Sequence, residues 1–224
     1  MSAVLQLLAV TPIAVSGGEV ARRQGRYDRL SPAGVRVLVE NLGTGSEVPR
    51  SLESDDDITA SERCLVARFQ AADTSRIDAL LPDCVLDPVV DLESSLFARP
   101  VYGILKLSTH FLLGQGLSVG AVARNGAIAH ELDRKLESYG CVGASGLTAI
   151  LGLSVEDISD DALWASASGE MLAASAADAV INGCSAVETH GGRPRGAVLV
   201  DPTATALQLL GLIARATRVT AVRE

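Results

Sequence analysis

The stretch Asp78–Cys84 (DALLPDC) follows the pattern Asp-Ala-aliphatic-aliphatic-x-x-Cys, and Asp178–Cys184 (DAVINGC) repeats this pattern further along the chain. The aliphatic run in each copy is typical of a strand that is buried on both faces of a parallel sheet. Each cysteine would then lie at the carboxyl end of its strand, where open α/β sheets bind their ligands. The repeat is either a coincidence in an alanine-rich chain or the sign of two similar lobes that direct two thiols into one cleft.

Similar aliphatic runs with little alternation predict strands at Val4–Val10, Arg36–Leu42, Ala79–Leu81, Val101–Leu105, Ser118–Ala123, Ala179–Asn182 and Ala197–Val200. Helical patterns lie between them, at Ser61–Ala72, Val89–Phe97, Ala127–Tyr139, Asp160–Ser175 and Thr203–Ala216. Asp87-Pro88 and Asp201-Pro202 each place a capping carboxylate before a proline at the first helical position. The alternation of strands and helices predicts an α/β fold.

The composition limits the kinds of partner that this chain can bind. Among its 224 residues, lysine and arginine number 19 against 27 aspartate and glutamate, so the formal net charge is −8. This excess of negative charge argues against a nucleic-acid-binding protein. Hydrophobic residues make up 48% and charged residues 21% of the chain, which excludes a disordered protein. We therefore expect a compact protein whose partner is a small-molecule substrate.

No segment predicts export or insertion into a membrane. The apolar stretch Met1–Val10 lacks a basic flank, and no later stretch reaches the roughly 18 apolar residues of a membrane helix. We expect a cytoplasmic protein with no membrane partner and with its cysteines as free thiols: Cys64, Cys84, Cys141 and Cys184. Because there is no CxxC pair and the three histidines are scattered, we expect no metal site.

Two segments have the composition of loops. Gly43–Thr59 contains glycine, proline and the acidic run Asp55-Asp56-Asp57, and a solvated loop is favoured there over a metal-binding carboxylate cluster. Glu188–Gly196 is expected to form either a lid or a simple turn.

Two cysteines at matched strand ends suit the inversion of a carbon that carries an acidic proton. This reaction needs a base on one face and an acid on the other, and a thiolate and a thiol exchange these roles at each turnover without a metal or a cofactor. The attacking thiol needs a pKa below its usual value of about 8.5, and helix N-termini expected after Cys84 and near Cys184 would lower it. We expect Cys64 and Cys141 to be structural.

Six short segments, in their order and spacing, resemble those of a known family: Val10–Pro12, Ser51–Glu53, Cys84–Pro88, Arg99–Ile104, Asn182–Ser185 and Val198–Pro202. Cys84–Pro88 resembles the family's Cys-x-x-Asp-Pro segment around its first catalytic cysteine. Asn182–Ser185 is similar to the Gly-Cys-Thr segment around the second one, and Arg99–Ile104 looks like the strand that opens the second lobe. The family is the Asp/Glu/hydantoin racemase superfamily, and the resemblance is closest to its hydantoin racemase branch.

The resemblance implies two pseudo-symmetric lobes, each a mostly parallel sheet flanked by helices, with the active site in the cleft between them. Residues 1–98 plus 200–224 would form the first lobe and residues 99–199 the second. The resemblance also implies a cofactor-independent enzyme that forms a homo-oligomer, with Cys84 and Cys184 as the catalytic acid and base. The presence of both cysteines argues against the family's decarboxylase branch, which keeps only one.

By the same resemblance, the substrate-binding residues are Thr11, Pro12, Ile13, Val85, Arg124, Gly183 and Ser185. Ile13 stands where the family has an asparagine, and Val89 where it has a glycine. Arg124 stands where many relatives have a threonine, and it either clamps a substrate carboxylate or faces solvent at a strand end. Ser185 keeps a hydroxyl group that can bind a substrate oxygen.

These observations predict a racemase or epimerase that acts on a carbon next to a carbonyl group, as in a 5-substituted hydantoin or a related amino-acid derivative. The departures from the family pattern leave open an alternative, in which the same thiols isomerise, eliminate or cyclise a specialised metabolite. A further alternative is a non-catalytic ligand-binding protein on the same fold, for which thiol pKa values at or above about 8.5 at both Cys84 and Cys184 would argue.

Overall fold

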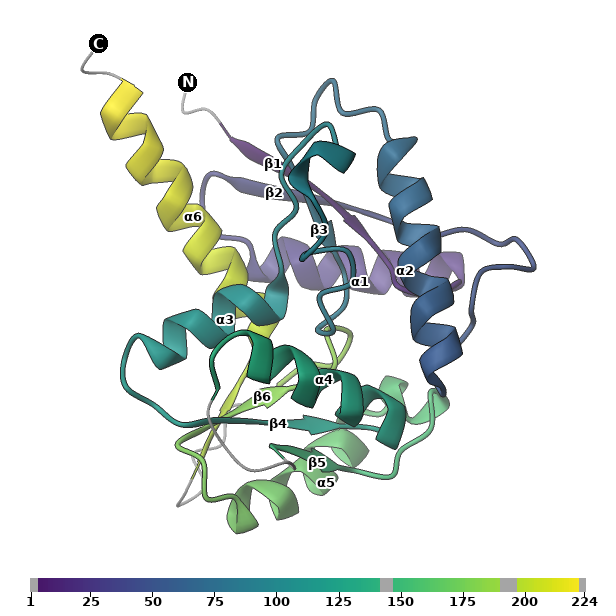
Figure 1. Ribbon diagram of the computed structural model, residues 1–224, viewed down its shortest axis with the longest axis vertical. Coiled ribbons are helices and arrows are strands. Elements are labelled where there is room, and N and C mark those ends of the chain that lie inside the picture. The colour runs from purple at the N-terminus through teal and green to yellow at the C-terminus, as the bar shows by residue number, and fades with distance from the viewer. Residues whose placement is uncertain (1–3, 142–146, 190–196, 222–224) are drawn as a thin grey trace.

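The computed structural model describes residues 4–141, 147–189 and 197–221 and contains two parallel sheets (Figure 1). The first has the strand order β2-β1-β3 and consists of β1 (Leu5–Val10), β2 (Val35–Glu40) and β3 (Ala79–Pro82). The second has the order β5-β4-β6-β7 and consists of β4 (Val119–Ala123), β5 (Thr148–Ile150), β6 (Ala179–Asn182) and β7 (Val198–Val200). All neighbouring strands are parallel, so the predicted α/β fold with two lobes is confirmed.

Helices flank both sheets: α1 (Gly17–Leu30), α2 (Asp55–Gln70), α3 (Ile104–Leu113), α4 (Gly126–Ser138), α5 (Asp161–Ala174) and α6 (Pro202–Ala221), with short 3-10 helices at Ser94–Leu96 and Glu156–Ser159. After β7 in the second sheet, α6 runs back to the first lobe, where it contacts α1 and β2, and it also packs on α3 (Figure 1). Along the described part of the chain, no helix has both the length and the apolar character that crossing a membrane requires.

The two copies of the repeat occupy equivalent places in the two sheets. β3 pairs with the central strand β1, and β6 pairs with the central strand β4. The carboxylate of Asp78 accepts the backbone N–H of Gln6 at 2.8 Å, and that of Asp178 accepts the N–H of Ser118 at 2.9 Å. The aspartate of the motif thus ties the start of each repeat strand to its central neighbour, which favours two similar lobes over coincidence.

One hydrophobic cluster connects the two lobes. It includes Leu7 and Leu81 from the first sheet, Ile181 from the second and Leu207 from α6, all with no exposed surface. Because apolar side chains of both sheets pack into the same core, the lobes form one body.

The lobe boundaries, residues 1–98 plus 200–224 and residues 99–199, stay a prediction. Val101 lies beyond the first of these boundaries, yet it forms a parallel bridge with Leu80 of β3. The chain therefore still contacts the first sheet as it leaves this lobe.

The predicted strand at Val101–Leu105 and the predicted helix at Val89–Phe97 are both wrong, and Asp87 explains why. This residue has a φ of 49°, which turns the chain out of a helical path. Its carboxylate accepts the backbone N–H groups of Leu105 at 3.0 Å and Lys106 at 2.7 Å. Asp87 therefore caps α3, later in the chain, instead of a helix that follows it directly.

Two other local predictions have different outcomes. The start signal at Asp201 is confirmed, because Pro202 begins α6 and Asp201 Oδ1 accepts an N–H of its first turn at 3.0 Å. The loop predicted at Gly43–Thr59 is wrong beyond Ser54, where α2 begins. Ser54 and Asp57 form a capping box, so the acidic run is the first turn of a helix, where negative charge is favourable.

The sequence patterns missed α1, α3 and β5. Helix α1 was missed because its buried face is polar: Arg23, Arg26 and Tyr27 are its buried residues. A search for apolar periodicity does not detect such a helix.

Candidate active site

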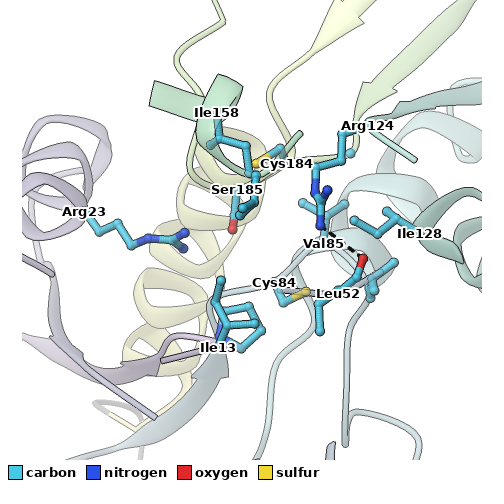
Figure 2. A pocket seen from close by; sticks show the side chains of 14 residues that line it. Ile13, Arg23, Leu52, Cys84, Val85, Arg124, Ile128, Ile158, Cys184 and Ser185 are labelled. Carbon is cyan, nitrogen blue, oxygen red and sulfur yellow. Dashed lines mark hydrogen bonds between the residues drawn. The ribbon is translucent and has the colours of Figure 1, made fainter. Parts of the chain in front are cut away.

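Cys84 and Cys184 follow the carboxyl ends of β3 and β6 and line one cavity of about 60 Å³ (Figure 2). The aliphatic side chains of its wall come from both lobes: Ile13, Leu52, Val85, Leu86, Ile128, Val155 and Ile158. Its polar side chains, apart from the thiols, are those of Arg23, Arg124 and Ser185. The fold therefore brings two thiols and two guanidinium groups together in a mostly apolar space.

Most of the residues that the sequence predicted for the site line this cavity: Pro12, Ile13, Cys84, Val85, Arg124, Gly183, Cys184 and Ser185. Thr11 does not. Its side chain is fully buried, donates to the carbonyl of Ile13 at 2.8 Å and accepts the N–H of Leu42 at 3.0 Å. Thr11 thus shapes the loop that carries Pro12 and Ile13, and its predicted contact with substrate does not fit this position.

Gly183 fixes the place of Cys184. Its N–H donates to the carbonyl of Val122 at 2.9 Å, which extends the pairing of β6 with β4 by one residue. A side chain at Gly183 would collide with the same carbonyl group. Only glycine allows this close approach directly before Cys184.

The environment of Cys84 contradicts the predicted fall in its thiol pKa. Burial, together with the neighbouring Asp83 and Asp87 carboxylates, raises the pKa of Cys84 to about 12. The backbone N–H of Leu86 acts in the opposite sense. No helix begins directly after Cys84, so the helix dipole that was expected to stabilise the thiolate is absent from this part of the described chain.

Cys184 has a different set of neighbours. Burial raises its thiol pKa as well, while Arg23, the N–H of Ala186 and Arg124 lower it. Here too, no helix follows directly in the described residues. The predicted fall in pKa below the ordinary thiol value is therefore wrong for both cysteines, although Cys184 has cationic neighbours that oppose the effect of burial.

The sequence left two alternatives for Arg124, a clamp for a substrate carboxylate or a solvent-facing residue at a strand end. The structure excludes the solvent-facing position. The residue is 4% exposed and lines the cavity. Its Nη2 donates to the carbonyl of Leu52 at 3.1 Å. Its Nη1 lies 2.7 Å from Glu53 Oε1 as an ion pair, but it makes no well-aligned hydrogen bond. Arg124 therefore has a buried N–H group available beside the cavity.

Helix α1 also contributes to the site, which the sequence patterns did not indicate. Arg23 Nη1 donates to Asp83 Oδ2 at 2.7 Å, and the hydroxyl of Tyr27 donates to Asp83 Oδ1 at 2.9 Å. Asp83 directly precedes Cys84, and Ser185 Oγ donates to its backbone carbonyl at 2.9 Å. These bonds fix the Cys84 loop against α1 and against the residue that follows Cys184.

The same helix also binds the Cys184 loop. Arg26 Nε donates to the carbonyl of Ser185 at 3.0 Å, and Arg22 Nη1 donates to the carbonyl of Ala186 at 2.8 Å. Arg26 also forms ion pairs with Glu188 and Asp201, each at 2.7 Å. The spacing of Arg22, Arg23, Arg26 and Tyr27 places them on neighbouring turns of a helix, which is the signal that could have indicated a polar buried face.

The other cysteines lie outside the cavity lining. Cys64 is partly exposed, and its Sγ lies 3.7 Å from the carbonyl oxygen of Glu47, while Cys141 is buried. Within the described residues, no group of three His, Cys, Asp or Glu side chains is arranged to hold a metal ion. Most of the predicted lid or turn at Glu188–Gly196 lies outside the described residues.

This chain is similar to known racemases. The family model described as Asp/Glu/Hydantoin racemase matches residues 29–210. Curated protein sequences give no match. Allantoin racemase from Pseudomonas fluorescens has a similar structure, with a TM-score of 0.75 and 15% sequence identity over 95% of this chain and 92% of that one.

Two further solved structures are similar. Allantoin racemase from Klebsiella pneumoniae has a TM-score of 0.73 and 14% identity, over 95% of this chain and 89% of the other. Aspartate racemase from Picrophilus torridus has a TM-score of 0.60 and 12% identity, over 95% of this chain and 94% of the other. These likenesses establish the fold, and the family match supports an isomerase-type function. Because the family model covers most of the chain, the protein belongs to the Asp/Glu/hydantoin racemase family.

Proposed function

We propose that this protein is a cofactor-independent racemase or epimerase in which Cys84 and Cys184 act as base and acid on opposite faces of an acidic carbon. The observation that carries the proposal is the placement of both thiols in one cavity, after equivalent strands of two lobes. Family membership supports the same class of reaction.

In the proposed step, the thiolate of one cysteine removes the proton from the carbon and becomes a thiol. The electron pair of the broken C–H bond moves into the adjacent carbonyl group and gives an enolate. The thiol of the other cysteine donates its proton to the opposite face of the carbon and becomes a thiolate. Protons and charge balance, and the next turnover runs with the two roles exchanged.

The cavity lining supports a substrate that combines a carbonyl group with an apolar substituent. We assign the carbonyl oxygen to the guanidinium of Arg124, because a donor placed there stabilises the charge of the enolate. The hydroxyl of Ser185 donates its proton to the carbonyl of Asp83 and is therefore not assigned to the substrate. The aliphatic wall around Ile13 and Ile128 would receive the substituent. A 5-substituted hydantoin with an aliphatic side chain, or a related amino-acid derivative, has both parts.

Two features of the same cavity favour a second candidate function. Ile13 replaces the family's amide, and Arg124 adds a buried guanidinium. With these changes, the same two thiols could isomerise, eliminate or cyclise a specialised metabolite. The product distinguishes this candidate from a racemase, because only racemisation returns the mirror image of the substrate.

The raised thiol pKa values also fit a non-catalytic ligand-binding protein on this fold. Such a protein would bind the ligand without exchanging its acidic proton. Proton exchange from carbon therefore separates this alternative from both enzymatic ones.

The test is incubation in deuterated water with 5-isobutylhydantoin, allantoin, aspartate, glutamate and substituted malonates. Mass spectrometry measures deuterium at the acidic carbon, and chiral chromatography measures configuration, each against the rate without protein. We expect deuterium gain and loss of optical purity for 5-isobutylhydantoin. Exchange with another product would favour the second candidate.

The matched controls are the double variant Cys84→Ser/Cys184→Ser and the single variant Cys141→Ser. The double variant should not exchange, whereas Cys141→Ser should keep the activity because this buried cysteine lies outside the cavity lining. Folded protein that binds a ligand of the panel but exchanges no proton would contradict the proposal.

A further inference from the structure

The charged groups that act on the two thiols differ. The guanidinium groups of Arg23 and Arg124 line the cavity that contains both thiols, and their positive charge lowers the pKa of Cys184 against the effect of burial (Figure 2). The carboxylates of Asp83 and Asp87, in contrast, lie next to Cys84 in the chain, and both are fully buried.

A second, smaller cavity places further acidic residues near Cys84. It has a volume of about 20 Å³ and is lined by Cys84 together with Glu62 and Glu131. The nearby cations are already paired: Arg134 with Glu131, and Lys135 with Asp91. Cys84 therefore has four acidic residues around it, of which Asp83 and Glu131 are paired with an arginine.

Arg23 is held rigidly beside the cavity. It is 6% exposed, and its Nη1 and Nε bind Asp83 at 2.7 Å and Glu19 at 2.8 Å. Since Arg22 and Arg26 bind the backbone carbonyls of the two residues after Cys184, the Cys184 loop cannot move away from α1 without breaking these bonds. Arginine stays protonated over the whole accessible pH range, so this charge is permanent.

We propose that Arg23 is a positioning residue that keeps the negative charge of the thiol pair on Cys184 in the free protein, so that Cys184 starts as the base and Cys84 as the acid. This role rests on the proposed function, because it assigns the two halves of the same proton transfer. The charged and titratable groups that face Cys184 are Arg22 and Arg23 from α1, Asp83 and Cys84 from the loop after β3, and Arg124 after β4.

With the negative charge on Cys184, the free protein reacts differently with the two enantiomers. The free protein can remove a proton only from the enantiomer whose C–H bond points toward Cys184. After that turnover the thiolate is on Cys84, and it returns to Cys184 by proton exchange before the next molecule of the same enantiomer reacts. The fixed charge of Arg23 favours that return.

The test measures the reactivity of each thiol and needs no substrate. The protein is treated with iodoacetamide from pH 6 to 10, and mass spectrometry of peptides gives the alkylation rate of Cys84 and Cys184 separately. The thiolate is the reacting form, so we expect the curve of Cys184 to rise at lower pH than that of Cys84. Arg23→Gln should slow alkylation of Cys184 at pH 7.5 by about tenfold, which corresponds to a rise of one pKa unit, and should change Cys84 much less.

Two variants serve as controls. Arg23→Lys keeps the positive charge and should restore most of the Cys184 rate. Arg29→Gln removes the same charge from an exposed position of α1 and should leave both rates unchanged.

Two results would overturn the inference: equal pH curves for both thiols in the unsubstituted protein, or equal slowing of both thiols by Arg23→Gln. The first needs no variant, so it holds even if Arg23→Gln does not fold. Unequal thiols without any deuterium exchange on carbon would instead remove the proposed function and leave the charge assignment standing.

Discussion

The loop after β3 and the loop after β6 share two backbone hydrogen bonds but have different surroundings. In each loop, the residue before the cysteine donates its backbone N–H to a carbonyl of the central strand. Asp83 donates to the carbonyl of Val10 at 2.8 Å, and Gly183 donates to that of Val122 at 2.9 Å. In each, the N–H three residues after the cysteine returns to the cysteine carbonyl, at 3.3 Å for Cys84 and 3.5 Å for Cys184. The repeat therefore preserves where each sulfur is placed.

The side chains at equivalent positions of these loops do not match. Asp83 corresponds to Gly183, and Asp87 corresponds to Val187. Both buried carboxylates thus belong to the Cys84 half, and α1 compensates only one of them, by the ion pair of Arg23 with Asp83. A repeated hydrogen-bond pattern thus holds two thiols in unequal electrostatic environments.

The largest expected effect comes from removing either thiol. Cys84→Ser and Cys184→Ser should each lower the racemisation rate by about 10²–10⁴-fold, the usual contribution of a positioned acid or base. Chiral chromatography of the most active substrate of the panel measures this rate. If one serine variant kept the full rate, the two loops would not share one reaction.

The next largest effect concerns the contact of α1 with the Cys184 half. Arg26→Ala removes the arginine that donates to the buried carbonyl of Ser185 and that pairs with Glu188 and Asp201, so the free energy of unfolding should fall by about 3 kcal/mol. Urea unfolding measures this change. Arg29→Ala, an exposed arginine of the same helix that pairs with Glu188, should cost at most about 1 kcal/mol. Equal losses would show that the buried position of Arg26 has no special role.

Asp87 is a titratable group in the Cys84 half, whereas the equivalent residue of the other half is Val187. Burial raises the pKa of Asp87 to about 7 from its ordinary value of 3.8. Between these two values the folded protein binds the proton more strongly than the unfolded chain, so this group's contribution to stability falls as the pH rises from about 4 to 7.

Relative to the unsubstituted protein, Asp87→Asn should therefore lower the free energy of unfolding less at pH 8 than at pH 5. Unfolding curves of both proteins at the two pH values measure this difference. Val187→Asn, at the equivalent place in the other half, should give a stability change that does not vary with pH. If Asp87→Asn lowered the free energy of unfolding equally at pH 5 and pH 8, the titration assigned to Asp87 would be wrong.

The smallest effect tests the similarity of the two halves rather than their difference. Asp78→Ala and Asp178→Ala each remove one carboxylate that accepts a backbone N–H at the start of a central strand. Both should lower the melting temperature slightly and by a similar amount. A clearly larger loss in one of them would show that the two motif aspartates are not equivalent.

The sequence predicted the parts of this molecule that depend on local pattern. The strands that precede Cys84 and Cys184 were found because a strand buried on both faces is a continuous aliphatic run. The convergence of the two cysteines followed from their common position at strand ends. Most of the residues that line the cavity next to them were found through motif resemblance.

What the sequence could not predict depends on partners that are distant along the chain. Asp87 was interpreted as the cap of the next helix, but it caps α3. Arg23 and Arg26 gave no apolar signal, because their burial is made possible by carboxylates at Asp83, Glu188 and Asp201. The thiol pKa values were predicted in the wrong direction, because burial outweighs the donors at each sulfur.

The central claim is that the two thiols act from opposite faces of the same carbon. Its most direct test is deuterium exchange by Cys84→Ser and by Cys184→Ser with each pure enantiomer of the same substrate. The account predicts that each variant exchanges the proton of one enantiomer with retention of configuration, and that the two variants prefer opposite enantiomers. If both variants exchanged the same enantiomer, the thiols would not lie on opposite faces of the reacting carbon.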